Sequence, residues 1–172
     1  MSIGQPVEPT PINPLFADAA TVSTTSTDGT EDDLLVRTVP AGSFAADGAR
    51  VDFSYMLTGV THATATRRYR AYFGGTVFTD SSNLAATAGH WAEVSGSIIR
   101  VSSSSVRVLF KLIAATNTTK QVIAAVMGKL DITDLDLTDD LVFRVTGTAA
   151  GTGAASGDIS LHGGTVSKVR TP

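Results

Sequence analysis

The chain has 172 residues, a length typical of a single domain, and 42% of them are hydrophobic, enough to form a core. Thirteen basic and sixteen acidic residues give a formal net charge of −3, which argues against nucleic acid as a partner. The sequence contains no cysteine, which excludes disulfide frameworks, cysteine-bound zinc and thiol catalysis. Because no signal peptide is visible and no apolar run approaches ~18 residues, we expect no membrane partner.

The N-terminal segment differs in composition from the rest of the chain. Residues 1–36 contain six acidic and no basic residues, and four of the six prolines lie within the first fourteen positions. Prolines at this spacing hold the backbone in extended conformations and exclude a helix. We therefore predict an extended, proline-rich, acidic arm and linker over residues 1–33, followed by one domain over 34–172.

From Leu34 onward, apolar and polar residues alternate, as strands with one buried face require. Val51, Phe53 and Tyr55, for example, share one face of their segment. Turn-forming residues separate such segments, and their spacing predicts eight or nine strands in an all-β sandwich or barrel. The predicted strands are 34–40, 49–58, 66–73, 76–80, 91–101, 105–112, 121–131, 141–147 and 158–169.

The segment 120–129, KQVIAAVMGK, is compatible with two structures. Val122, Val126 and Met127 would share one side of a short helix, whereas Val122, Ala124 and Val126 alternate as in a strand. We favour the strand, because the helix would lack a good N-terminal cap.

The tetrapeptide GGTV occurs twice, at residues 74–77 and 163–166. Paired glycines adopt the positive φ angles of tight hairpin turns, and no helix signal follows either copy to form a phosphate-binding loop. We therefore predict two similar turns.

The predicted core contains the apolar side chains that the strands direct to one face of each sheet. Leu109 and Ile113 lie on the opposite face, where they form a second apolar set available for self-association. The expected core residues are Val51, Phe53, Tyr55, Phe73, Val106, Val108, Phe110, Phe143 and Val145.

The polar residues follow no catalytic or metal-binding pattern. His62, His90 and His162 lack neighbours of ligand type, and the sequence has no G-x-S-x-G motif. The acidic run 130–140 lacks the glycine and the terminal glutamate of a calcium-binding loop, which favours a solvated strand and turn. We therefore expect no catalytic residue, no cofactor, no metal site and no enzymatic activity.

A basic and aromatic cluster lies in the segment 66–73, where Arg68, Arg70 and Tyr72 share one face. Residues 37–130 hold ten basic residues against four acidic ones, whereas the arm is acidic. Opposite charges on one small chain favour self-association or docking onto a protein partner over binding to nucleic acid.

Several turns and strands form a combined pattern over residues 34–170. Its elements are Val39-Pro40-Ala41, Ala46-Asp47-Gly48, the strand Val51 to Leu57, the basic strand Arg67 to Phe73, Phe73-Gly74-Gly75-Thr76, Asp80-Ser81, Trp91, the strand Ile98-Ile99-Arg100, and Leu141 to Gly147 followed by a glycine-rich loop and Asp158-Ile159. Together these elements resemble a jelly-roll domain of tailed-bacteriophage structural proteins.

This resemblance implies an antiparallel jelly-roll-type β-sandwich. It further implies a trimeric virion protein and supplies no catalytic residue. The extended N-terminal arm, which the prolines predict, departs from the family, whose fibre members usually follow a longer shaft sequence. We expect a capsid decoration or cement protein on the capsid exterior, made in the host cytoplasm, whose partners are itself and the major capsid protein or another virion protein. The alternative is a receptor- or glycan-binding tip of a tail or head fibre.

The arm carries the candidate partner-binding residues. Extended segments bind by placing alternate side chains in pockets of a neighbour, and prolines reduce the entropy lost on ordering. The bulky apolar side chains of the arm are the expected anchors: Ile3, Val7, Ile12, Leu15 and Phe16.

Overall fold

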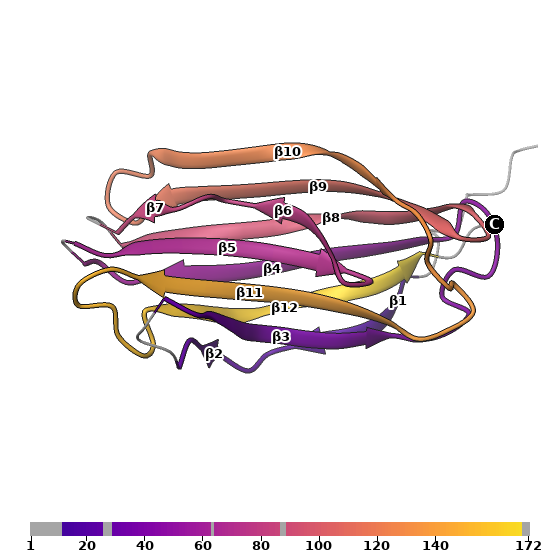
Figure 1. Cartoon of the computed structure of the whole chain (residues 1–172), viewed down its shortest axis with the longest axis horizontal. Coiled ribbons are helices and arrows are strands. Elements are labelled where there is room, and N and C mark those ends of the chain that lie inside the picture. Colours follow the sequence, from indigo (N-terminus) through magenta and orange to yellow (C-terminus); the bar gives the residue numbers. More distant parts are fainter. Residues whose placement is uncertain (1–11, 26–28, 63, 87–88, 170–172) are drawn as a thin grey trace, which may run out of the picture.

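A computed structural model describes residues 12–25, 29–62, 64–86 and 89–169. This described part is all-β and contains no helix, so the predicted all-β class is confirmed. The strands run along the long axis of the molecule (Figure 1). They are β1 (Ile12–Asp18), β2 (Val22–Ser23), β3 (Glu31–Val39), β4 (Arg50–Gly59), β5 (Thr66–Phe73), β6 (Thr76–Asp80), β7 (Leu84–Ala85), β8 (His90–Ser102), β9 (Ser105–Thr116), β10 (Val122–Ile132), β11 (Leu141–Ala150) and β12 (Ile159–Val169).

The strands form two antiparallel sheets that pack as a sandwich. The seven-stranded sheet has the order β1-β12-β4-β8-β9-β10, and β2 adds to β12. The five-stranded sheet has the order β3-β11-β5-β6, and β7 adds to β5. Because β3, β4 and β5 alternate between the sheets, as do β10, β11 and β12, each sheet is assembled from segments far apart in sequence.

The core lies between the sheets and contains the predicted side chains. Eight of the nine expected core residues are buried, and Phe110 is half-buried and packs against them. Phe53 lies 5.1 Å from Phe143 and 5.4 Å from Phe78, measured between ring centroids, so these rings join β4 to β11 and β6 of the opposite sheet. Strand alternation therefore predicted the buried face correctly.

Residues 122–129 of the segment 120–129 belong to strand β10, as predicted, and not to a helix. Its register pairs Val126 with Leu112 and Met127 with Lys111 of β9. Val126 is half-buried against the core, whereas Met127 is 70% exposed, which is the alternation of a strand with one solvent face.

The two GGTV copies adopt different structures. Gly74 and Gly75 have φ angles of 54° and 83° and form the tight turn between β5 and β6, as predicted. The prediction of a second turn is wrong, because Gly163 and Gly164 lie inside β12 beside a register shift. A side chain on Gly164 would meet the carbonyl oxygen of Ser54 and the ring of Tyr55, so close packing against β4 requires glycine there.

The described N-terminal residues belong to the sandwich itself, which differs from the predicted division at residue 34. Strand β1 is extended as expected, but it pairs with β12 at the edge of the seven-stranded sheet, and β3 already begins at Glu31. Asp18 anchors β1, because its carboxylate accepts hydrogen bonds from Arg37 Nε at 3.0 Å and Tyr55 Oη at 3.2 Å. These contacts link β1 to both sheets.

The candidate anchors of the arm fall into two groups. Leu15 and Phe16 are half-buried against the protein's own core, and Ile12 pairs through its backbone with β12 opposite Val169. Ile3 and Val7 lie outside the described residues. Their role as anchors on a partner stays a prediction.

Replacement of Phe143 by alanine tests the aromatic contact between the sheets. We expect F143A to lower the free energy of unfolding by about 3–5 kcal/mol, since a buried phenylalanine leaves a cavity when it is truncated. The neighbouring Val142 is exposed, so V142A should change the free energy of unfolding by less than about 0.5 kcal/mol. Urea denaturation followed by circular dichroism measures both. Equal losses in the two variants would contradict the assignment.

Candidate functional site

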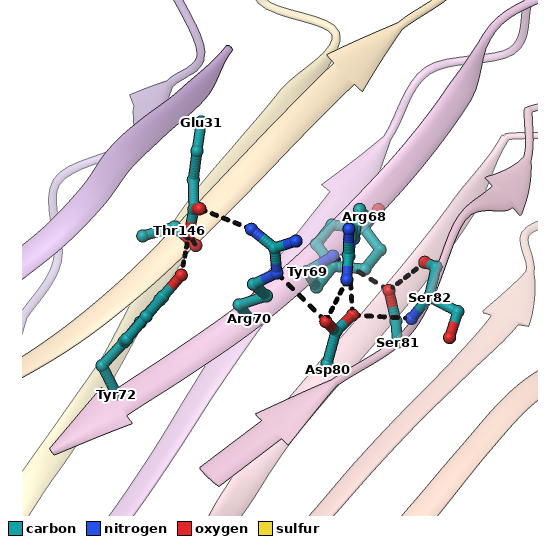
Figure 2. A network of polar contacts seen from close by, with 9 residues as sticks. All are labelled: Glu31, Arg68, Tyr69, Arg70, Tyr72, Asp80, Ser81, Ser82 and Thr146. Carbon is teal, nitrogen blue, oxygen red and sulfur yellow. Dashed lines mark hydrogen bonds and ion pairs between the residues drawn. The ribbon is translucent and has the colours of Figure 1, made fainter. Parts of the chain in front are cut away.

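The basic and aromatic cluster of β5 lies on the outer face of the five-stranded sheet, within a polar network (Figure 2). Arg68 and Arg70 both donate to Asp80 on β6, from their Nε atoms at 2.8 and 3.0 Å. The backbone N–H of Ser82 also donates to this carboxylate at 2.8 Å. Arg67 points to the opposite face, where it is buried and paired with Asp158 at 2.8 Å.

Glu31 on β3 closes the other end of the network. Arg70 Nη1 donates to it at 2.5 Å, and the hydroxyls of Tyr72 and Thr146 donate to its second oxygen. Figure 2 shows these side chains converging from β3, β11 and β5. Glu31 and Asp80 together neutralise Arg68 and Arg70, so the charge pairing occurs within the molecule.

The network shifts the ionisation of both carboxyl groups. The hydrogen bond from Arg68, helped by those from Ser82 and Arg70, lowers the pKa of Asp80 to about 2. Burial opposes ionisation of Glu31, but the hydrogen bonds from Thr146, Tyr72 and Arg70 outweigh it and hold the pKa of Glu31 below its ordinary value. Both groups are therefore structural carboxylates rather than proton donors at neutral pH.

A groove of about 590 Å³ lies beside this network on the same outer face. Its walls come from β3, from the turn between β5 and β6, and from the start of β11. The lining residues are Asp33, Val36, Tyr72, Gly74, Gly75, Asp140, Leu141, Val142 and Arg144.

Arg144 is the central polar side chain of the groove. Its guanidinium lies over the Tyr72 ring, 4.0 Å from the ring centroid, and its Nη1 is 3.3 Å from Asp33 Oδ1. Asp140 stands at another part of the wall, where its Oδ1 accepts a hydrogen bond from the backbone N–H of Ala41 at 2.7 Å. The groove therefore combines one cation and two carboxylates with apolar side chains.

The outer face of the seven-stranded sheet has a different character. Met56, Leu109, Ile113 and Met127 form what we call the outer apolar face, on β4, β9 and β10. Met127 is 70% and Leu109 is 41% exposed. Between them, Lys111 Nζ pairs with Glu93 at 3.0 Å, so charges of both signs accompany the apolar side chains.

The sequence singled out some of these residues and missed others. It placed Arg68, Arg70 and Tyr72 on one face and Leu109 and Ile113 on another, as observed. It missed the groove, whose residues come from segments that pair only after folding. The one sequence signal for this groove was the position of Arg144 on the outward face of the alternating segment 141–147.

Within the described ranges, no group of three histidine, cysteine or acidic side chains is placed to hold a metal ion. The histidines make separate polar contacts: His90 Nε2 lies 2.5 Å from the Tyr69 hydroxyl, and His162 Nε2 lies 2.7 Å from the Thr58 hydroxyl. Among the same residues, no helix is long and apolar enough to cross a membrane.

No protein-family model and no curated protein matches the chain. A solved structure, the CBM2 module of Lactobacillus casei BL23 phage J-1 evolved Dit, is similar over 88% of this chain and 76% of its own. The identity is 10% and the TM-score is 0.39. A similarity at this level assigns neither function nor ligand, which must follow from this chain's own residues.

The low pKa of Asp80 predicts a specific pH dependence of stability. Its ion pairs contribute stability that is fully present above its ordinary pKa of 3.8 and is lost as the pH falls toward about 2. The difference in unfolding free energy between wild type and D80N should therefore be constant near neutral pH and shrink across this window. Urea denaturation at a series of pH values measures it. A difference that persists unchanged to the lowest pH would contradict the prediction.

Proposed function

We propose that this chain is a non-enzymatic structural protein of a tailed-phage virion, which decorates or cements the capsid exterior as a homotrimer. The resemblance of residues 34–170 to phage jelly-roll domains supports the virion context, and the β-sandwich is the architecture that this resemblance implies. The observation that carries the proposal is the outer apolar face, because its exposed side chains need a partner surface.

Self-association explains this face better than solvent exposure does. Exposed apolar side chains gathered on one sheet face mark interaction surfaces. Here Leu109 and Met127 are exposed on adjacent strands, in neighbouring rows that also carry Lys111. The pairs Glu93–Lys111 and Arg107–Asp131 on the same sheet carry both signs of charge, so identical copies approach without net repulsion. A second or third copy is thus a chemically suitable occupant.

Attachment to the capsid is assigned to the segment before β1. Leu15, Phe16 and Asp18 hold β1 on the sandwich, at the edge of the seven-stranded sheet. Ile3 and Val7, together with Ile12 where β1 begins, are the proposed anchors in pockets of the major capsid protein or another virion protein.

A second candidate function is receptor or glycan binding at the tip of a tail or head fibre. The groove beside Arg144 favours it, because this concavity combines apolar and polar groups on the face away from the outer apolar face.

Disruption of the outer apolar face tests assembly. We expect light scattering to show a trimer for the full chain and a folded monomer for the double variant L109D/M127D, since each aspartate would be buried against an apolar neighbour. Val77 is 40% exposed on β6 of the other sheet, so V77D should remain trimeric. A wild-type monomer at all concentrations would contradict the proposal.

Deletion of residues 1–11 tests attachment. We expect the truncated chain to keep its β-type circular dichroism and its trimeric state, because β1 remains intact, while co-sedimentation with capsids is lost. Cryo-electron microscopy of intact particles should place wild-type copies on the capsid lattice. Density confined to fibres, or unchanged capsid binding after the deletion, would contradict capsid anchoring by this segment.

A further inference from the structure

We infer that the groove on the outer face of the five-stranded sheet binds a neutral oligosaccharide, with Arg144, Asp33 and Asp140 as its polar contacts. This inference rests on the second candidate function and deepens it, and it is independent of assembly through the outer apolar face. The groove lies on the opposite sheet of the sandwich from that face.

The strand register places the groove residues in adjacent rows. Arg144 lies on β11, between β3 and β5. Its register partner is Val36 on β3 and Tyr72 on β5. Two residues earlier, Val142 accepts a backbone hydrogen bond from Gly74 at 3.0 Å, which brings the Gly74-Gly75 turn to the edge of the groove. A continuous surface therefore spans three strands and one turn.

The chemistry of this surface suits a sugar. A pyranose ring presents C–H groups on its faces and, at its edge, hydroxyls that both donate and accept hydrogen bonds. Val36 and Val142 are exposed and offer apolar contact for the ring face. The guanidinium of Arg144 offers donors, while Asp33 and Asp140 offer acceptors, so both hydroxyl functions find a partner.

The charge of the groove selects among saccharides. Asp33 and Asp140 outnumber Arg144, which leaves an excess of one negative charge at the lining. The neighbouring pairs of Arg68 and Arg70 with acidic residues add no net cation. An anionic ligand would meet this excess at close range, so the groove favours an uncharged ligand.

The polar side chains are held in place before a ligand arrives. Arg144 rests on the Tyr72 ring and pairs with Asp33, and Tyr72 in turn donates to Glu31. The backbone of Ala41 holds the Asp140 carboxylate. The side chains of Arg144 and Asp33 are nevertheless 36% and 49% exposed, so a ligand reaches them. Such preorganisation reduces the entropy lost on binding.

Titration of the full-length protein with defined sugars tests the inference. The neutral probes are cellotetraose, maltotetraose and chitotetraose, and the anionic probe is sialyllactose, each followed by amide chemical shifts at millimolar concentration. We expect at least one neutral probe to shift the resonances of residues 72–75 and 140–144 selectively. Binding of none of the neutral probes, stronger binding of sialyllactose, or shifts confined to β8, β9 and β10 would overturn the inference.

A matched pair of variants assigns the contacts. R144A should weaken binding of the active probe about tenfold or more, since it removes a charged hydrogen-bond donor. R50A removes an arginine that pairs with Asp52 at 2.6 Å on the opposite sheet, and it should leave affinity unchanged. If R144A does not fold, D140N takes its place and should also weaken binding. Equal effects of R144A and R50A would overturn the assignment. Light scattering on the same samples reports assembly separately.

Discussion

Contact between aromatic rings of the two sheets is the interaction on which the rest of the structure depends. Phe53 of the seven-stranded sheet packs against Phe78 and Phe143 of the five-stranded sheet, and Tyr55 stacks on Phe143 at 5.7 Å. In a strand, each side chain that enters the core directs its neighbours to the outer face. Burial of Phe143 therefore places Val142 and Arg144 outside, and burial of Val108 does the same for Leu109.

The two outer faces that result differ in chemistry. On the five-stranded sheet, arginines and carboxylates pair across β3, β11, β5 and β6, and the groove beside them offers donors and acceptors. On the seven-stranded sheet, apolar side chains remain exposed among balanced ion pairs. The proposed assembly surface and the proposed ligand groove therefore lie on opposite sheets, where neither would block the other.

Strand β1 connects the N-terminal segment to this arrangement. It adds to the edge of the seven-stranded sheet, and Asp18 holds it through Arg37 of the opposite sheet and Tyr55 of the core. These side-chain contacts fix the place of β1 at the edge of the sheet.

Alternation of side chains is a local property of the chain, so nine of the twelve strands in the described part, β10 among them, were predicted from the amino-acid sequence, as was the Gly74-Gly75 turn. Strands β1, β2 and β7 were not predicted as strands. Which strands become neighbours depends on long-range pairing within the folded chain. Gly164 lies inside β12, where Ser54 and Tyr55 of β4 leave no space for a side chain. Strand β1 joins the sandwich through its pairing with β12 and through the contact of Asp18 with Arg37. The groove likewise requires Asp33, Tyr72 and Arg144, which are distant in sequence and meet only through sheet pairing. Such contacts leave no local pattern in the sequence, and that is the physical reason why they could not be predicted from it.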